Sequence, residues 1–400
     1  MRLLITGLVA ALALAGCRPT LPQAMPEEFA WHSKGTGWSM SAETGVMLAE
    51  VGPGIAWARY RTDAEEPLYA LRVIGNGDEV LLERASRAPV SECRAAVLDS
   101  LTAVHTVSLR SVVGSQSVSV ERRERLDIVG GPSRAWAIQA PVGTRLAWAL
   151  LPGSEPGLLA ETDRRLRRYS SAGKTLWHAD TGPVAGLLAS GETGYALLMD
   201  STLVAIGLED GKERWRRGLK SVWAWASVPG GLALAADGQV LALDASGGER
   251  WRVPLGAGRL TAFSASPVMV LALTGETLAA LDLTDGSQRW AMQSVQSCLP
   301  APDGQAGIVA TAEGGLLVEM ASGQVLRAVP GLAGWTSEGL LLTVDGDAIT
   351  VYSAAGAEQR RVSLELSPGE RVIRLGGGAG FIYAVTLAGE RQRLLCLKGD

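Results

Sequence analysis

The sequence predicts an all-β fold made of repeated four-stranded sheets, and three features of the 400 residues support this class. Glycine occurs 49 times and separates many short apolar runs, as in turn-rich β proteins. A strand–turn–strand unit such as LDASGGERWRVPL (243–255) recurs at a nearly constant interval. Asp-Gly and Gly-Gly turns between apolar runs indicate β-hairpins throughout the chain.

The charge and histidine content of the chain argue against several classes of function. Net charge is −4, and acidic and basic residues are mixed along the chain, so we expect no nucleic-acid partner. Histidine occurs only 3 times, and acid–base catalysis and metal binding draw heavily on histidine. No Ser-His-Asp or Cys-His arrangement and no metal-ligand spacing is visible. We therefore expect a protein that is not an enzyme, with no metal and no cofactor.

The first 17 residues, MRLLITGLVAALALAGC, have the pattern of a secretory signal peptide. A basic Arg2 precedes an apolar run that is shorter than the roughly 20 residues a membrane-spanning helix needs. The ending Leu14–Cys17 resembles a bacterial lipobox, in which the cysteine thiol receives a diacylglycerol. We expect Cys17 to be lipidated, palmitate included, and to anchor the chain in a lipid bilayer. An ordinary signal peptide with a chance cysteine is the alternative.

Residues 18–28, RPTLPQAMPEE, predict a short proline-rich tether. In lipoproteins an Asp directly after the lipidated cysteine often marks retention in the inner membrane, and this chain has Arg18 there. The resemblance implies the periplasmic face of the outer membrane, with the inner membrane as the alternative. Of Cys93, Cys298 and Cys396, we expect at least two to be buried thiols, and one disulfide among them stays open.

The repeat is clearest in residues 141–400. Four hairpins keep a glycine four residues before a tryptophan: Gly173/Trp177, Gly211/Trp215, Gly247/Trp251 and Gly286/Trp290. These glycines lie 38, 36 and 39 residues apart, and Gly323 and Gly356 continue the series with arginines in place of tryptophan. About four short strands per period are typical of a β-propeller blade. Stacking blades around an axis covers both apolar faces of each sheet.

The ring must also close. The last repeat, residues 380–400, lacks a fourth strand, which would leave strand edges unpaired. We expect an N-terminal strand within 29–40 to complete it, with Trp31 or Trp38 at the tryptophan position of the repeat.

Residues 29–140 are expected to supply this closing strand and one irregular blade. Within it, 91–106 predict a helical insertion, because Ala95, Leu98, Leu101 and Val104 share one helical face. Counting both hairpins of this stretch as separate blades gives nine, above the usual range. We therefore expect eight four-stranded blades, with seven behind a small α+β domain as the alternative.

The spacing Ala-x-Asp-x-x-Thr-Gly-x-x-x-Trp is the docking motif of the quinoprotein-type (PQQ-like) repeat propellers, and this chain resembles that family. Ala280, Asp282, Gly286 and Trp290 match at full spacing. Asp244 and Trp251 match with one residue fewer. The resemblance implies that each tryptophan packs between neighbouring blades and that the aspartates and turn residues hydrogen-bond the blade edge.

The family has two branches. PQQ dehydrogenases use adjacent cysteines, a calcium ion held by carboxylates and an Asn, and a catalytic Asp. No two cysteines are adjacent here, and the sole asparagine, Asn76, falls in a hairpin turn. The non-catalytic branch includes a lipoprotein of the outer-membrane assembly machinery. The resemblance implies a protein-interaction scaffold with an envelope protein as partner. The first alternative is a module that binds a glycan or small molecule in the central funnel. The second, less favoured alternative is a PQQ-dependent dehydrogenase.

Two clusters are candidate partner or ligand surfaces. One is a basic run, which either binds a partner or is simply a solvated outer strand: Arg164, Arg165, Arg167 and Arg168. Residues 121–127, ERRERLD, are interpreted as a solvated strand whose arginines pair with its own glutamates. Trp223 and Trp225 are expected on one face of an innermost strand, where they line the channel mouth or pack between blades.

Overall fold

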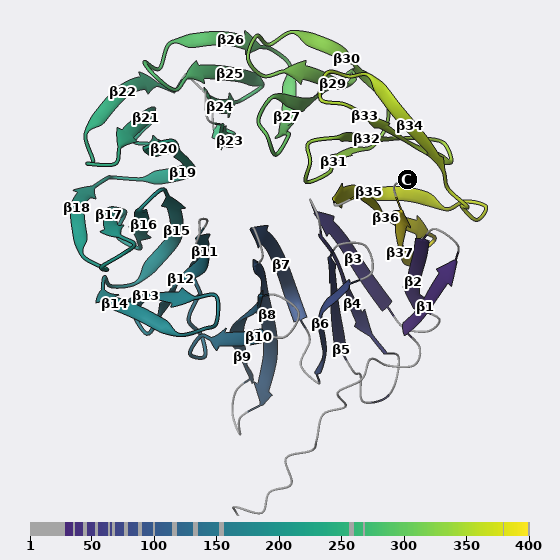
Figure 1. The fold of residues 1–400 in the computed structure, drawn as a ribbon, viewed down its shortest axis with the longest axis horizontal. Helices are drawn as coiled ribbons and strands as arrows, with labels where there is room; N and C mark the ends of the chain where they lie inside the picture. Colours follow the sequence, from purple (N-terminus) through teal and green to yellow (C-terminus); the bar gives the residue numbers. More distant parts are fainter. Residues whose placement is uncertain are drawn as a thin grey trace, which may run out of the picture.

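The computed structural model is a closed ring of β-sheets arranged as the blades of a propeller (Figure 1). It describes residues 29–398 apart from gaps at 35–36, 43–45, 53–54, 63–64, 66–68, 76–78, 87–89, 99–100, 114–117, 131–134, 152–155, 256–259, 267–268 and 379. The expected signal peptide, Cys17 and the tether lie outside the described residues. In the described part, no helix has the length and apolarity needed to cross a bilayer.

The described residues form nine sheets, and each blade runs from an innermost to an outermost strand. Blades 1 to 3 are β3 (Val46–Gly52), β4 (Ile55–Arg61), β5 (Tyr69–Gly75), β6 (Glu79–Ser86); β7 (Val90–Leu98), β8 (Leu101–Val113), β9 (Val118–Gly130), β10 (Ala135–Gln139); and β11 (Trp148–Leu151), β12 (Gly157–Thr162), β13 (Arg165–Ser170), β14 (Thr175–Asp180).

Blades 4 to 6 are β15 (Val184–Ser190), β16 (Thr193–Leu198), β17 (Thr202–Gly207), β18 (Glu213–Gly218); β19 (Val222–Val228), β20 (Gly231–Ala236), β21 (Gln239–Asp244), β22 (Glu249–Pro254); and β23 (Leu260–Ala265), β24 (Met269–Thr274), β25 (Thr277–Asp282), β26 (Gln288–Met292). Blades 7 and 8 are β27 (Val295–Pro300), β28 (Ala306–Thr311), β29 (Gly314–Glu319), β30 (Val325–Val329); and β31 (Ala333–Trp335), β32 (Leu341–Asp345), β33 (Ala348–Tyr352), β34 (Glu358–Ser363). Blade 9 combines both ends of the chain: β35 (Arg371–Gly378), β36 (Phe381–Ala388), β37 (Arg391–Lys398), β2 (Gly37–Ala42) and β1 (Phe29–Lys34).

The expectation of seven or eight blades is wrong, because the propeller has nine. The two hairpins of residues 41–140 belong to two complete blades, β3–β6 and β7–β10, rather than to one irregular blade. The repeat motif is weak in this stretch, so the sequence did not indicate that it contains a second blade.

The expected helical insertion at 91–106 is also wrong, because 91–98 belong to β7 and 101–106 belong to β8. Leu101 packs in the core between blades 2 and 3, whereas Val104 packs in the core between blades 1 and 2. They therefore lie on opposite faces of one strand. A strand that is buried on both faces is a continuous apolar run, and such a run does not distinguish strand from helix by its period.

The N-terminal residues close the ring with two strands. Strand β2 pairs antiparallel with β37 and completes blade 9, and β1 adds a fifth, outermost strand. Trp38 stands opposite Cys396 in this register, as Trp290 stands opposite Ala280 in blade 6. The side chains of Trp31 and Trp38 lie outside the described residues.

Apolar packing between blades builds the core. Nine clusters of buried hydrophobic side chains are present among the described residues, and each joins two neighbouring blades. In β12, for example, Leu158 and Ala160 pack toward blade 2 while Leu159 packs toward blade 4. This alternation follows from the two-residue period of a strand. Every sheet is thus buried on both faces.

Tryptophans of the outermost strands fasten successive blades. The indole Nε1–H donates to a backbone carbonyl in the next blade at 2.6 to 3.0 Å in five cases: Trp136 to Ser171, Trp177 to Leu208, Trp215 to Ala245, Trp251 to Leu283 and Trp290 to Met320. In blade 7, Arg327 takes this position: its guanidinium lies 4.0 Å from the Tyr352 ring and donates to the Gly356 carbonyl. Trp136 extends the series into blade 2, where sequence spacing alone did not assign it.

The glycine that receives each ring has no room for a side chain. A Cβ at Gly173, Gly211, Gly247, Gly286 or Gly323 would lie 2.7 to 2.8 Å from the tryptophan of the preceding blade. These five glycines also have φ between +68° and +82°. Glycine is therefore required both by backbone conformation and by the close approach of the ring.

The motif aspartates act within their own turns. Asp244 accepts hydrogen bonds from the backbone N–H groups of Ser246 and Gly248 and from the Ser246 hydroxyl. Asp282 accepts from the Thr284 N–H and from the Arg289 guanidinium. The Ser246 hydroxyl hydrogen bond, with the backbone donors, lowers the pKa of Asp244, and the Thr284 N–H with Arg289 does the same for Asp282. These bonds shape the turns on which the tryptophans of the preceding blades rest.

The three described cysteines are free thiols, with Cys93 and Cys396 buried and Cys298 half-buried. This confirms the expectation of at least two buried thiols. Burial raises the pKa of Cys93 to about 12 and that of Cys298 to about 11, which makes both poor nucleophiles.

We predict that Gly286→Ala destabilises the ring more than Gly275→Ala in the same blade. Both glycines have positive φ, +75° and +58°, so alanine at either costs about 1–2 kcal/mol in backbone strain. Only Gly286 also faces a ring, that of Trp251, which adds an overpacking cost of about 1–3 kcal/mol; a Cβ at Gly275 meets open space. Thermal unfolding of both variants measures the difference. Equal midpoints would contradict the docking role of the ring.

Candidate functional site

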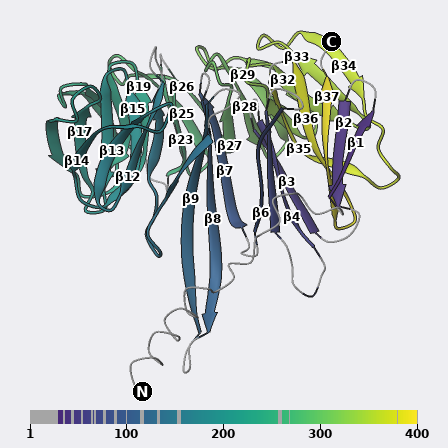
Figure 2. The ribbon, with the colours of Figure 1, turned by 60° about the horizontal axis from the view of Figure 1, so that its bottom comes forward.

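One end of the ring carries a projecting hairpin. Strand β7 pairs with β8 only as far as Ser108, and β10 pairs with β9 only from Arg125 to Val129, whereas β8 and β9 continue pairing to Val113 and Val118. The extension stands out from the ring in Figure 2. We call this end the hairpin face. It also carries the turn between β12 and β13 (163–164) and the connection 140–147, because all blades share one orientation.

A buried charge network holds the base of this hairpin. The Glu124 carboxylate accepts hydrogen bonds from Arg122 Nε at 2.6 Å, from His105 Nε2 at 3.0 Å and from the backbone N–H of Leu146 at 2.8 Å. Ala140 N–H and Gly143 N–H donate to the carbonyls of β9 residues Glu124 and Arg122. Glu124 therefore fixes the connection 140–147 against the hairpin.

The prediction of a solvated strand over 121–127 is wrong at two positions. The side chains of Glu124 and Asp127 are 2% and 5% exposed. Asp127 pairs with Arg84 of blade 1 at 3.0 Å and with Arg125 at 2.7 Å. The sequence shows the charges, but only the packing of blades 1 to 3 buries them.

Burial and hydrogen-bond donors together set the protonation states of Glu124 and His105. Burial acts to raise the pKa of Glu124, but the Leu146 N–H, Arg122 and His105 together hold it below the ordinary value. Burial lowers the pKa of His105, against the opposite effect of Glu124. At neutral pH the pair is therefore a carboxylate and a neutral imidazole that donates its Nε2–H.

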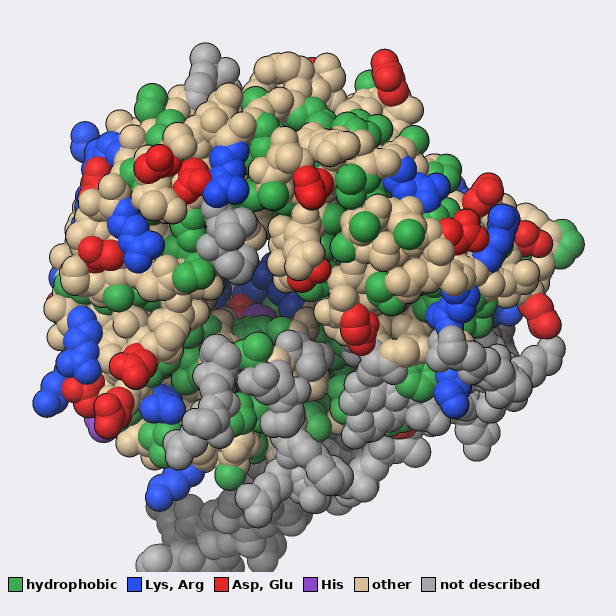
Figure 3. Space-filling view, turned by 45° about the horizontal axis from the view of Figure 1, so that its top comes forward, with side chains coloured by type: hydrophobic (Ala, Val, Ile, Leu, Met, Phe, Trp, Pro, Cys, Tyr) green, Lys and Arg blue, Asp and Glu red, His purple; other side chains and the backbone are tan. Residues whose placement is uncertain are grey.

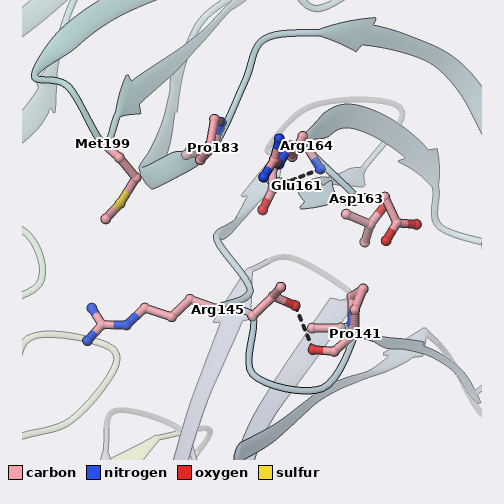
Figure 4. Close-up of a pocket in the computed structure, with 11 residues that line it drawn as sticks. Pro141, Arg145, Glu161, Asp163, Arg164, Pro183 and Met199 are labelled. Atoms are coloured by element: carbon pink, nitrogen blue, oxygen red, sulfur yellow. Dashed lines mark hydrogen bonds between the residues drawn. The ribbon is translucent and has the colours of Figure 1, made fainter.

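Beside this network lies a pocket between blades 3 and 4 that encloses about 590 Å³ (Figure 4). Its lining comes from the connection 140–147, from the β12–β13 turn with the end of β12, and from two segments of blade 4: Ala140, Pro141, Thr144, Arg145, Glu161, Thr162, Asp163, Arg164, Pro183, Val184 and Met199. In Figure 4, Glu161 and Arg164 lie on one side and Pro141 on the other, while the Arg145 side chain points away from Glu161.

Two polar side chains in the wall of this pocket are buried. Glu161 is 8% exposed, and its Oε1 accepts a hydrogen bond from the Arg164 N–H at 2.7 Å. Thr162 is 5% exposed, and its hydroxyl oxygen has no hydrogen-bond partner among the described residues. Burial raises the pKa of the Glu161 carboxyl. Asp163 and Arg164 between the strands both have positive φ, +55° and +62°, which is costly for residues other than glycine.

Exposed apolar side chains surround this region. Met199 at the pocket is 65% exposed, and Val142 in the connection 140–147 is 54% exposed. On the hairpin, Val120 is 62% and Leu109 is 38% exposed. These side chains place apolar surface in water at the pocket and along the hairpin.

The arginine run does not form a single patch. Arg164 lines the pocket, and Arg165 is exposed and pairs with Asp180 at 2.8 Å. Arg167 is half-buried, and Arg168 donates to the Leu208 carbonyl at 2.7 Å, the same oxygen that Trp177 uses. Alternation along β13 thus directs Arg168 into the blade interface, and Arg164 is the member of the run that faces the pocket.

The two tryptophans of β19 also have different surroundings. A register shift between Val222 and Ala224 leaves Trp223 in a β-bulge, where it is 55% exposed. The Trp225 ring packs against Gly186 of the neighbouring innermost strand, 3.0 Å from where a Cβ would lie. The bulge, which the sequence does not reveal, separates them.

Charge is otherwise scattered. Figure 3 shows acidic and basic side chains mixed over one face of the ring, and acidic, basic and histidine atoms inside the central opening. Within the described ranges, no three His, Cys, Asp or Glu side chains lie close enough to hold a metal ion. The features that the described site presents to a ligand are therefore a pocket, exposed apolar side chains and a buried carboxylate.

Fold and repeat together define a class: a β-propeller whose blades are joined by tryptophan docking, similar to the quinoprotein-type repeat propellers. The family model that matches this chain is described as outer membrane protein assembly factor BamB, and it matches residues 199–330 and 236–371. The resemblance drawn from the docking motifs is thereby confirmed, and this part of the chain is BamB-like.

Other comparisons are more distant. The crystal structure of BamB from Moraxella catarrhalis is similar at 12% identity over 94% of this chain and 100% of that chain, with a TM-score of 0.39. The computationally designed Ika8 protein is similar at 12% identity over 93% and 98%, with a TM-score of 0.45. Hsv2 from Kluyvelomyces marxianus is similar at 10% identity over 71% and 86%, with a TM-score of 0.42. No curated protein matches the sequence.

We predict that Glu124→Ala loosens the connection 140–147. Alanine removes every side-chain acceptor, so the Leu146 N–H loses its partner at a cost of about 1–3 kcal/mol. Amide hydrogen exchange at Leu146 should accelerate about tenfold or more. The control is Glu92→Ala, at an exposed carboxylate 3.7 Å from the same Arg122. Unchanged exchange at Leu146 in Glu124→Ala would show that the carboxylate does not hold the connection.

We predict the opposite effect for Glu161→Gln, which should raise the midpoint of thermal unfolding at pH 7.5. The folded-state pKa of Glu161 is raised by burial, so its charged form destabilises the fold above that pKa. The gain should shrink as pH falls and vanish below about 4.3, the usual pKa of an unfolded glutamate. Glu192→Gln, on an exposed turn at the opposite end of the ring, is the control. A lower midpoint for Glu161→Gln at pH 7.5 would contradict this account.

Proposed function

We propose that this protein is a non-catalytic scaffold of the bacterial envelope, anchored through Cys17 at the periplasmic face of the outer membrane, and that its hairpin face binds a protein involved in outer-membrane protein assembly. The observation that carries the proposal is the match of residues 199–371 to a family model described as outer membrane protein assembly factor BamB. Lipidation of Cys17 rests on the lipobox resemblance.

The geometry favours binding over catalysis. Nine interlocked blades hold the hairpin and the pocket on a rigid frame, so little conformational entropy is lost when a partner binds. Exposed Met199, Val142 and Val120 offer apolar contacts that a partner would bury. Among the described residues, β8 beyond Ser108 pairs with β9 alone, and this edge suits addition of a strand from the partner.

The position of Phe29, where the described chain starts, indicates which end of the ring faces the membrane. Phe29 pairs with Ala42, at the end of blade 9 from which the chain passes to blade 1. That end is the hairpin face. A tether of residues 18–28 reaches at most about 40 Å when extended. We therefore propose that the hairpin face is turned toward the membrane that holds Cys17.

A second function has one observation in its favour. Trp223 exposes 55% of its surface on an innermost strand, where it is available to stack on a glycan or small ligand in the central opening. Loss of ligand binding in Trp223→Ala, with partner capture intact, would favour this second function.

We predict that the tagged, membrane-extracted protein captures a specific envelope protein and that Val120→Asp reduces this capture at least tenfold. Val120 is exposed on the hairpin, and the matched control Leu176→Asp makes the same change at an exposed apolar residue of β14, beside the β13–β14 turn at the opposite end of the ring. Affinity purification with mass spectrometry measures both. Cys17→Ala should lose both the membrane fraction and the capture. A wild-type protein with no reproducible partner would overturn the scaffold function.

A further inference from the structure

We infer that the pocket between blades 3 and 4 receives a lysine or arginine side chain of the partner, with Glu161 as its counter-charge. This inference rests on the proposed function, because it names the chemistry by which the hairpin face recognises a protein. It goes beyond that function by assigning a residue type to the partner and a recognition residue, Glu161, to this chain.

Glu161 is the central observation. Its carboxylate is buried in the pocket wall, and Oε1 receives one hydrogen bond, from a backbone N–H. Among the described residues, no arginine, lysine or histidine lies within salt-bridge distance of it. A buried carboxylate without a cation is unfavourable, because burial removes water without supplying a counter-charge. An entering ammonium or guanidinium group supplies that charge.

The walls suit the stem of a long basic side chain. Ala140, Pro141, Pro183, Val184 and Met199 present apolar atoms on the way to Glu161. Lysine and arginine cover their methylene groups with apolar surface while the charged end finds polar partners. The volume of about 590 Å³ leaves room for such a side chain and part of its backbone.

The two arginines of the pocket do not satisfy Glu161: burial raises the pKa of Glu161 although the charge of Arg164 acts to lower it. Arg145 and Arg164 are both exposed, and Arg145 points away from Glu161 (Figure 4). Water and salt screen exposed charges strongly and buried ones weakly, so the buried carboxylate dominates the inner pocket. Because Arg145 and Arg164 are positively charged, an anionic group on the partner is the main competing occupant of the pocket. Butyrate represents this occupant in the first experiment.

The turn that holds Glu161 in place is strained. Asp163 and Arg164 adopt φ of +55° and +62°. The β20–β21 turn has a similar φ of +54° at its first position, Asp237, but its second position is Gly238, where this turn has Arg164. The strained conformation aims the Arg164 N–H at Glu161 and leaves the carboxylate facing the pocket. Strain of this kind persists where the surroundings impose it, and it is frequent at binding sites.

The first experiment uses small probes and one reporter. Protein with ¹³C-labelled methionine methyl groups is titrated with n-butylammonium and n-butylguanidinium, with n-butanol as the neutral control and butyrate as the anionic one. The methyl signal of Met199, at the pocket, should shift saturably with the two cations only. Glu161→Gln should weaken this response at least tenfold. A response to butyrate, or an equal response to n-butanol, would overturn the inference.

The second experiment uses the intact lipidated protein and its captured partner. Glu161→Gln should reduce capture at least tenfold without lowering the midpoint of thermal unfolding, which separates lost recognition from misfolding. Equal capture by wild type and Glu161→Gln would overturn the inference and leave the scaffold function standing. Absence of any captured partner with the wild type would overturn the scaffold function, and the methyl titration would then decide the pocket chemistry alone.

Discussion

Mutual burial of neighbouring blades is the constraint on which this structure depends. Each four-stranded sheet has two apolar faces, and each of the nine hydrophobic clusters belongs to two blades at once. A blade removed from the ring would expose both faces, at about 25 cal/mol per Å² of apolar surface. The ring therefore must close, and the chain closes it by joining strands from its two ends in blade 9.

The docking tryptophans give this packing its regularity. Each ring lies on a glycine of the next blade and donates to a carbonyl of the same turn, so one residue supplies apolar area, a hydrogen bond and a fixed distance. Blades 2 to 6 use tryptophan and blade 7 uses Arg327 on Tyr352. Because this frame is rigid, blade 2 can extend β8 and β9 far beyond its neighbours.

Two buried glutamates on the hairpin face show how environment decides the role of one side chain. Glu124 has three donors, keeps a lowered pKa and holds a connection in place. Glu161 has one backbone donor and a raised pKa, and it faces a pocket. The satisfied carboxylate is structural, whereas the incompletely satisfied one is where an external cation gains most.

The sequence by itself determined the all-β class, the repeated meander of 141–400 and the glycine–tryptophan spacing, because turns and strand periods are local properties of neighbouring residues. Only the tertiary structure decided the number of blades and the strands at 90–113, since a run buried on both faces has no distinctive period. It alone also decided the Glu124 network and the Glu161 pocket. Their members come from segments separated along the chain, and only the stacking of blades 2, 3 and 4 brings them together and removes the water between them.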